Sequence, residues 1–255
     1  MIYLKSGRGI AAESLVRENT ALQWLEHKHI TVPKVLNYFK DESSGQVYLL
    51  LSVIDGLPAQ RVTDLSKQEI LYLVAKAMQQ FHSINFQGSK NLRTLVQDLT
   101  HIQAIINLNL IKRSKFQTAN NGKTPEEVYV YLLQVKDKFS KDVIVHGDYC
   151  LPNIIITKNS YGFIDVGDCG PGDPYKDFSA MEVSIARNFG KEWTDVFYKY
   201  YDQKICVDSQ KIKYFQLIDQ FGYHLDVEKY RQAIRVSNVW TAPRQLLSSN
   251  QTSSK

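Results

Sequence analysis

The sequence has little of what would tie the chain to a membrane or to a disulfide framework. No apolar run reaches the roughly 18 residues of a membrane-spanning helix, and the N-terminus lacks the charged-then-apolar pattern of a signal peptide. The 3 cysteines are odd in number and show no CxxC spacing, which argues against a zinc site and suits a reducing compartment. We therefore expect a cytoplasmic protein with no role at a membrane.

The sequence also lacks a concentrated basic segment of the kind that binds nucleic acid. The formal net charge is +5, but the basic residues are dispersed and no recognised nucleic-acid-binding motif accompanies them, so we expect no nucleic-acid partner. The hydrophobic content of 44% and the charged content of 22% are ordinary for a globular protein. The 255 residues suffice for one domain or two closely packed lobes.

The most informative pattern that is present is a loop between short apolar runs. Asp148 and Asn153 lie five residues apart, and Asp165 follows twelve residues later at the end of another apolar run. Kinases use this spacing to assemble a catalytic base and the ligands of magnesium. Each residue alone would be explained by a turn cap or a backbone hydrogen bond. The three in this order instead favour phosphoryl transfer.

These residues resemble the motifs of the aminoglycoside phosphotransferases, including the 3'-phosphotransferases, which are relatives of protein kinases. The resemblance runs from Tyr3 to about Phe221. It implies an α+β, protein-kinase-like fold with two lobes, ATP and Mg²⁺ as cofactors, and a small hydroxylated molecule as substrate. It makes Asp148 the catalytic base and Asn153 and Asp165 the metal ligands. The matching pattern is His146-Gly147-Asp148-x4-Asn153 followed by Gly162-Phe163-Ile164-Asp165-x-Gly167.

The beginning of the chain supplies a candidate nucleotide site. A short strand ending at Lys5 precedes a helix expected over residues 11–29, whose leucines place Glu18 on the apolar face. A carboxylate there is costly unless a cation meets it, which predicts a Lys5–Glu18 pair; the alternative is that Glu18 turns toward solvent beside Arg17. The resemblance implies that Lys5 neutralises ATP phosphates, that Glu18 holds it, and that Tyr3 stacks on adenine.

Two further strands are expected at residues 32–36 and 47–54, joined by a turn at residues 41–45. The resemblance makes the end of the second strand the hinge between the lobes. Backbone groups near Ser52 and Ile54 would there bind adenine. The alternative is an ordinary core strand followed by a turn.

The pattern changes from strands to helices near residue 56. We expect residues 1–56 to form a partial N-lobe with the hinge, residues 57–247 a mainly helical C-lobe with the catalytic and metal-binding loops, and residues 248–255 a disordered tail. The N-lobe is expected to be truncated to antiparallel strands and one helix, because family members carry further strands and a glycine-rich loop before the strand of Lys5.

The substrate side departs from the family in its charges. The family holds its polycationic substrates with acidic residues through Coulomb attraction. Here residues 88–124, which contain clusters of Gly, Asn and Ser, carry the densest basic patch at 112–115. Arg187 and Asn188 stand where the family has later helical acids. Asn188 and Asp219 are the candidate substrate contacts.

The sequence thus predicts an ATP-dependent O-phosphotransferase, with its acceptor open. The resemblance implies phosphorylation of aminoglycoside-type antibiotics and hence antibiotic resistance. The changed charges favour a kinase of another neutral or anionic hydroxylated metabolite. The missing glycine-rich loop favours a third interpretation, a non-catalytic pseudokinase or binding module. In the family the residue at Asp177 braces the catalytic loop, so a structural role is expected for it.

Overall fold

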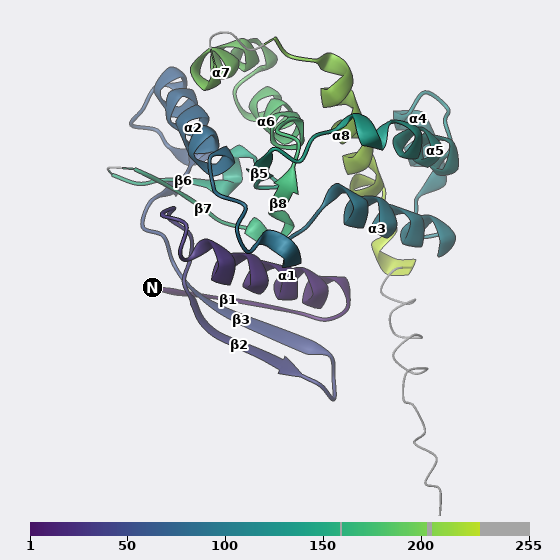
Figure 1. Cartoon of the computed structure of the whole chain (residues 1–255), viewed down its shortest axis with the longest axis horizontal. Helices are drawn as coiled ribbons and strands as arrows, with labels where there is room; N and C mark the ends of the chain where they lie inside the picture. The colour runs from purple at the N-terminus through teal and green to yellow at the C-terminus, as the bar shows by residue number, and fades with distance from the viewer. Residues whose placement is uncertain (159, 203–205, 230–255) are drawn as a thin grey trace, which may run out of the picture.

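The structure, a computed structural model, describes residues 1–158, 160–202 and 206–229. The expected tail at residues 248–255 and the last part of the expected C-lobe lie outside these ranges. Within the described residues, no helix combines the length and the apolar character needed to cross a membrane. Figure 1 shows a small sheet with one helix on one side of the molecule and a mainly helical part on the other. The arrangement is α+β, as predicted.

The sheet of the N-terminal part consists of three antiparallel strands in the order β1-β3-β2. The strands are β1 (Ile2–Gly7), β2 (Val35–Asp41) and β3 (Gln46–Ser52). Alternate residues of β3, namely Val47, Leu49 and Leu51, are buried on the face that α1 (Ile10–Leu25) covers. Helix α1 lies between this sheet and the rest of the molecule (Figure 1), so it packs against both parts.

Two boundaries in this part differ from the sequence predictions. The strand expected at residues 32–36 begins only at Val35 and then runs on to Asp41. Pro33 has no backbone N–H to give to a sheet, which explains the late start. The helix expected over residues 11–29 ends at Leu25, because the chain turns there and reaches a left-handed conformation at His29 (φ 54°).

The rest of the chain is mainly helical. The helices lie around short strands that carry the predicted catalytic loop (Figure 1). Two of the helices, α3 and α4, fall in the region 88–124, where the sequence pattern assigned none. The helices are α2 (Lys67–His82), α3 (Leu95–Asn107), α4 (Arg113–Ala119), α5 (Pro125–Val135), α6 (Tyr175–Asn188), α7 (Thr194–Tyr201) and α8 (Ser209–Tyr223).

The short strands form two small antiparallel sheets that fix the ends of the loops. One sheet has the order β4-β6-β7 and the other pairs β5 with β8. These strands are β4 (Leu57–Pro58), β5 (Val143–Val145), β6 (Ile154–Ile156), β7 (Tyr161–Phe163) and β8 (Gly170–Gly172). Residues 146–153 therefore connect two sheets, and residues 164–169 connect them again. Both polar loops start and end on anchored backbone.

One apolar core runs through both parts of the molecule. It includes Leu22 of α1, Leu49 of β3, Phe81 of α2 and Phe178 of α6. A second core packs α3, α5 and α8 around Phe116. Because the first core is continuous across the change from strands to helices, the division near residue 56 stays a prediction.

Phe81 is the residue whose removal tests the importance of this core. It is 0% exposed, and its ring centroid lies 4.9 Å from that of Phe163 and 5.4 Å from that of His146. We expect Phe81→Ala to lower the free energy of unfolding by about 3–5 kcal/mol, because it removes a buried ring and leaves a cavity. Equilibrium urea unfolding followed by tryptophan fluorescence measures this. The matched control, Phe86→Ala at a ring that is 38% exposed, should cost about 1 kcal/mol or less; equal losses would contradict the assignment.

Candidate active site

The loop at residues 146–153 depends on a glycine for its shape. Gly147 has a left-handed backbone (φ 88°), and a Cβ atom there would collide with the carbonyl oxygen of Asp168. The loop between β5 and β6 therefore packs directly on the turn that follows Asp165. The close approach brings the two polar loops of the predicted site together.

A buried carboxylate holds this loop in place. Asp177 in the first turn of α6 accepts hydrogen bonds from the backbone N–H groups of His146 (2.8 Å) and Gly147 (2.9 Å). Its Oδ2 also lies 3.0 Å from Nε2 of His82, which contacts the hydroxyl of Tyr201 through Nδ1. Burial by itself raises the pKa of Asp177, but His82 and His146 outweigh it and the net pKa is lowered. The carboxylate is therefore ionised, and it makes the bracing contacts expected from the sequence.

The predicted base and the first predicted metal ligand are joined by hydrogen bonds. The side-chain amide nitrogen of Asn153 donates to the backbone oxygen and to Oδ2 of Asp148, each at 2.9 Å. Asn153 is buried, whereas Asp148 is exposed. With its nitrogen committed to Asp148, the amide has its oxygen left as the atom that can bind a cation. The other carboxylate oxygen of Asp148, Oδ1, makes no hydrogen bond to Asn153.

The predicted Lys5–Glu18 pair is confirmed. The ammonium of Lys5 donates to both carboxylate oxygens of Glu18, at 2.7 and 2.8 Å, and Glu18 is only 4% exposed. The same ammonium is also hydrogen-bonded to Asp165. Burial lowers the pKa of Lys5, but the two carboxylates raise it by more. Lys5 is therefore a charged link between β1, α1 and the loop after β7.

All the residues predicted to bind the nucleotide line one cavity. Its volume is about 300 Å³, and Asp165 lies at its edge. The backbone N–H of Ser52 already donates to the carbonyl oxygen of Lys34 at 2.9 Å, so a base bound here would need other backbone groups, such as those of Ile54. Tyr3 faces the cavity from the helix-covered side of the sheet and stays exposed. The predicted residues in this lining are Tyr3, Lys5, Glu18, Ser52 and Ile54.

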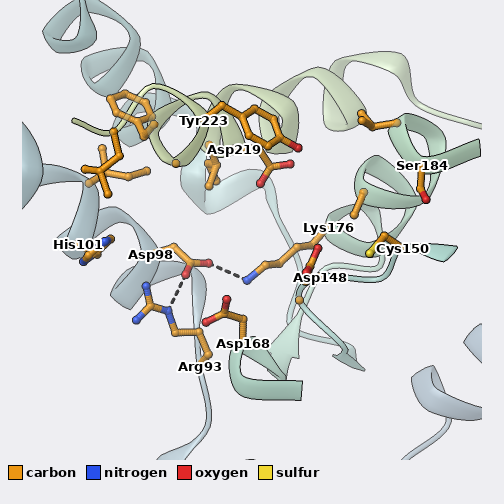
Figure 2. Close-up of a pocket in the computed structure, with 18 of the residues that line it drawn as sticks. Arg93, Asp98, His101, Asp148, Cys150, Asp168, Lys176, Ser184, Asp219 and Tyr223 are labelled. Atoms are coloured by element: carbon orange, nitrogen blue, oxygen red, sulfur yellow. Dashed lines mark hydrogen bonds and ion pairs between the residues drawn. The ribbon is translucent and has the colours of Figure 1, made fainter. Parts of the chain in front are cut away.

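A second and larger cavity, of about 580 Å³, is lined by residues of the loop at 146–153 together with residues of α3, α6 and α8 (Figure 2). The predicted base Asp148 lines it together with both candidate substrate residues, Asn188 and Asp219. Asn188 donates its amide to the carbonyl oxygen of Ser184 at 2.8 Å, which fixes the direction of its oxygen. The loop at residues 164–169 lines both cavities, with Asp165 in the wall of the first and Asp168 in the wall of the second.

Sequence reasoning missed an ion cluster in the wall of this second cavity. Asp98 of α3 accepts hydrogen bonds from Arg93 (2.7 Å) and from Lys176 of α6 (2.9 Å), as the dashed lines in Figure 2 show. Burial opposes the charge on Asp98, but Lys176 and Arg93 lower its pKa below the usual value. Lys176 and Asp98 are 78 residues apart, so no local pattern could have paired them.

The two predicted metal ligands suit a divalent cation whose remaining ligands would be phosphate and water oxygens. Among the described residues, no group of three or more His, Cys, Asp and Glu side chains could hold an ion. Asn153 and Asp165 offer one amide oxygen and one carboxylate, and the N–H of Ile164 binds the carbonyl oxygen of Asn153 at 3.0 Å, which brings the two loops together. The ammonium of Lys5 beside Asp165 shows that this carboxylate accepts a cation. A magnesium ion here would need phosphate and water oxygens as well.

The fold and the site define a protein-kinase-like phosphotransferase of the class that transfers a phosphoryl group to an alcohol group of a small molecule. The chain belongs to the phosphotransferase enzyme family, whose model matches residues 3–215. It is 29% identical over 222 residues to an aminoglycoside 3'-phosphotransferase from Niallia circulans, covering 86% of this chain and 83% of that relative.

Solved structures of the same kind confirm the kinase-like fold. An aminoglycoside 3'-phosphotransferase of type VIII superposes with a TM-score of 0.76 at 20% identity, over 86% of this chain and 84% of that one. An aminoglycoside phosphotransferase from Streptomyces rimosus, in complex with ADP and streptomycin, gives a TM-score of 0.71 at 22% identity, over 86% of each chain. At these identities the likeness concerns the fold.

Asp219 makes the stability of the protein depend on pH. Burial raises its pKa from 3.8 to about 7, so the folded state favours the protonated form. The stabilisation from this proton is present at low pH and is lost as the pH rises through about 7. We expect the stability advantage of Asp219→Asn over the wild type to grow by about 2 kcal/mol between pH 5 and pH 8.5. Chemical unfolding at both pH values measures it. A constant difference, or the same growth in the exposed control Asp142→Asn, would contradict this.

Proposed function

We propose that the protein is an ATP-dependent O-phosphotransferase that phosphorylates a hydroxyl group of a small molecule bound beside Asp148. One observation carries the proposal. The loop at residues 164–169 lines both cavities: Asp165 lines the one that contains Lys5 and Glu18, and Asp168 lines the one that contains Asp148 and Asp219. A phosphoryl donor in the first and an acceptor in the second would meet where Asp148 and Asn153 are hydrogen-bonded.

The residues suit the requirements of phosphoryl transfer, which are positioning and charge neutralisation. The acceptor hydroxyl donates a hydrogen bond to the carboxylate of Asp148, which orients the hydroxyl. As the hydroxyl oxygen attacks the γ-phosphorus, Asp148 takes the hydroxyl proton. The bond from this phosphorus to the β-phosphate oxygen breaks, and ADP leaves with the electron pair. Lys5, held by Glu18, stabilises the negative charge of the phosphates.

Asn153 and Asp165 are the residues that would hold Mg²⁺. Bound there, the ion would supply positive charge against the phosphate oxygens. Asp177 would keep Asp148 in position, because it accepts two hydrogen bonds from backbone N–H groups of the same loop. Tyr3, Ser52 and Ile54 complete the proposed adenine side of the nucleotide cavity.

The relatives suggest which acceptors to test first. Those named above are aminoglycoside phosphotransferases, and one solved structure contains ADP and streptomycin. By this similarity aminoglycoside-type antibiotics are the first acceptors to test, with a cytoplasmic, resistance-type role, and the charges of the second cavity decide which amines such an acceptor can carry. The intact set of Lys5, Glu18, Asp148 and Asn153 favours catalysis over a purely binding role. A different acceptor class stays open, because the second cavity also contains arginine and lysine.

Asp148→Asn is the direct test of the proposed base. The change keeps an oxygen that can accept from Asn153, so the protein should fold with its melting temperature nearly unchanged. It removes the proton acceptor, and we expect kcat to fall by about 10²–10⁴-fold. A coupled assay of ADP release across a panel of sugars, amino alcohols and aminoglycosides measures this. The exposed control Asp142→Asn should retain full activity. Unchanged turnover in Asp148→Asn would refute the proposed role.

A further inference from the structure

The cavity beside Asp148 contains almost as much positive as negative charge. Three cationic side chains line it, and they come from the segment before α3 and from α6. Four carboxylates line it as well. The cations are Arg93, Lys176 and Arg187, and the acids are Asp98, Asp148, Asp168 and Asp219. How strongly this site binds a charged ligand depends on which of these groups already form ion pairs within the protein.

Two of the four carboxylates are neutralised by the protein itself. Asp98 is shared between Arg93 and Lys176, at 2.7 and 2.9 Å, and all three side chains are largely buried. Asp168 lies 3.3 Å from Nε of Arg17 on α1. Neither carboxylate offers a ligand uncompensated negative charge. If a ligand ammonium displaced Lys176 from Asp98, it would leave a buried lysine without its partner, which is costly.

Only one carboxylate besides the proposed base is left for a ligand cation. Within the described residues, Asp219 forms no salt bridge, and Figure 2 shows it and Tyr223 directed from α8 into the cavity. Arg187 is exposed and, like Asp219, forms no salt bridge in the described part of the chain. Above its raised pKa, where it is ionised, Asp219 can attract one ammonium group, whereas Arg187 repels any further one that approaches along α6.

On the basis of the proposed phosphotransferase function, we infer that this cavity selects a hydroxylated acceptor with at most one ammonium group and discriminates against polycations. Arg187 is the residue that sets this selectivity, and the buried Arg93–Asp98–Lys176 cluster makes the wall behind it unable to compensate a second positive charge. An amino sugar or amino alcohol with a single amine fits these charges, and a molecule with several amines does not.

The test compares glucosamine, which has one amine, with kanamycin, which has several. We expect the wild type to have the higher kcat/KM for glucosamine. Arg187→Glu should raise kcat/KM and affinity for kanamycin by about tenfold or more at low ionic strength, with a much smaller gain at high salt. In Arg187→Glu the kcat/KM for glucose, which has no amine, should change far less than the kcat/KM for kanamycin. Lys199→Glu on α7, an exposed residue outside this cavity, makes the same charge change and is the matched control.

Calorimetric binding of both acceptors separates this inference from the proposed function. If neither acceptor is phosphorylated but Arg187→Glu gains kanamycin affinity and Lys199→Glu does not, the proposed reaction fails and the selectivity stands. Preferential binding of kanamycin by the wild type would overturn the inference. An equal response of Arg187→Glu and Lys199→Glu would overturn it too, as would no gain in either variant.

Discussion

The buried carboxylate of Asp177 is the group on which the rest of the site depends. An ionised carboxylate without partners could not be buried, so its position requires the two loop N–H groups and the His82 ring that surround it. That requirement fixes the backbone of residues 146–147 and hence the direction of Asp148. Because Lys176 precedes Asp177 on the same helical turn, the start of α6 both braces the loop at residues 146–153 and forms part of the wall of the cavity beside Asp148.

A second charged group ties the two parts of the molecule together. Lys5 belongs to the sheet, Glu18 to the helix that covers it, and Asp165 to the loop that follows β7. Because these three side chains come from different elements and all line one cavity, that cavity exists only in the assembled molecule.

Much of the site could be predicted because its signals are local. The apolar spacing of α1 places Glu18 on the buried side, and a buried acid demands a cation, so the Lys5 pair followed from periodicity and electrostatics. Thr124 before Pro125 and Glu127 marks the start of α5 by its capping box. The region 88–124 carries the same signal for α3, a capping box formed by Thr94 and Gln97, but the Gly, Asn and Ser clusters around it outweighed that signal in the prediction.

The sequence by itself determined the chemistry on offer: a loop with Asp148 and Asn153, a later Asp165, and a lysine that must meet a glutamate. Only the tertiary structure decided what surrounds that chemistry. Arg93, Asp98 and Lys176 meet across a large separation in the chain, and α8 brings Asp219 into the same cavity, where it forms no salt bridge with any described residue. Spacing along a chain records which side chains share a strand or helix face, whereas the pairing of charges from different elements depends on how those elements pack.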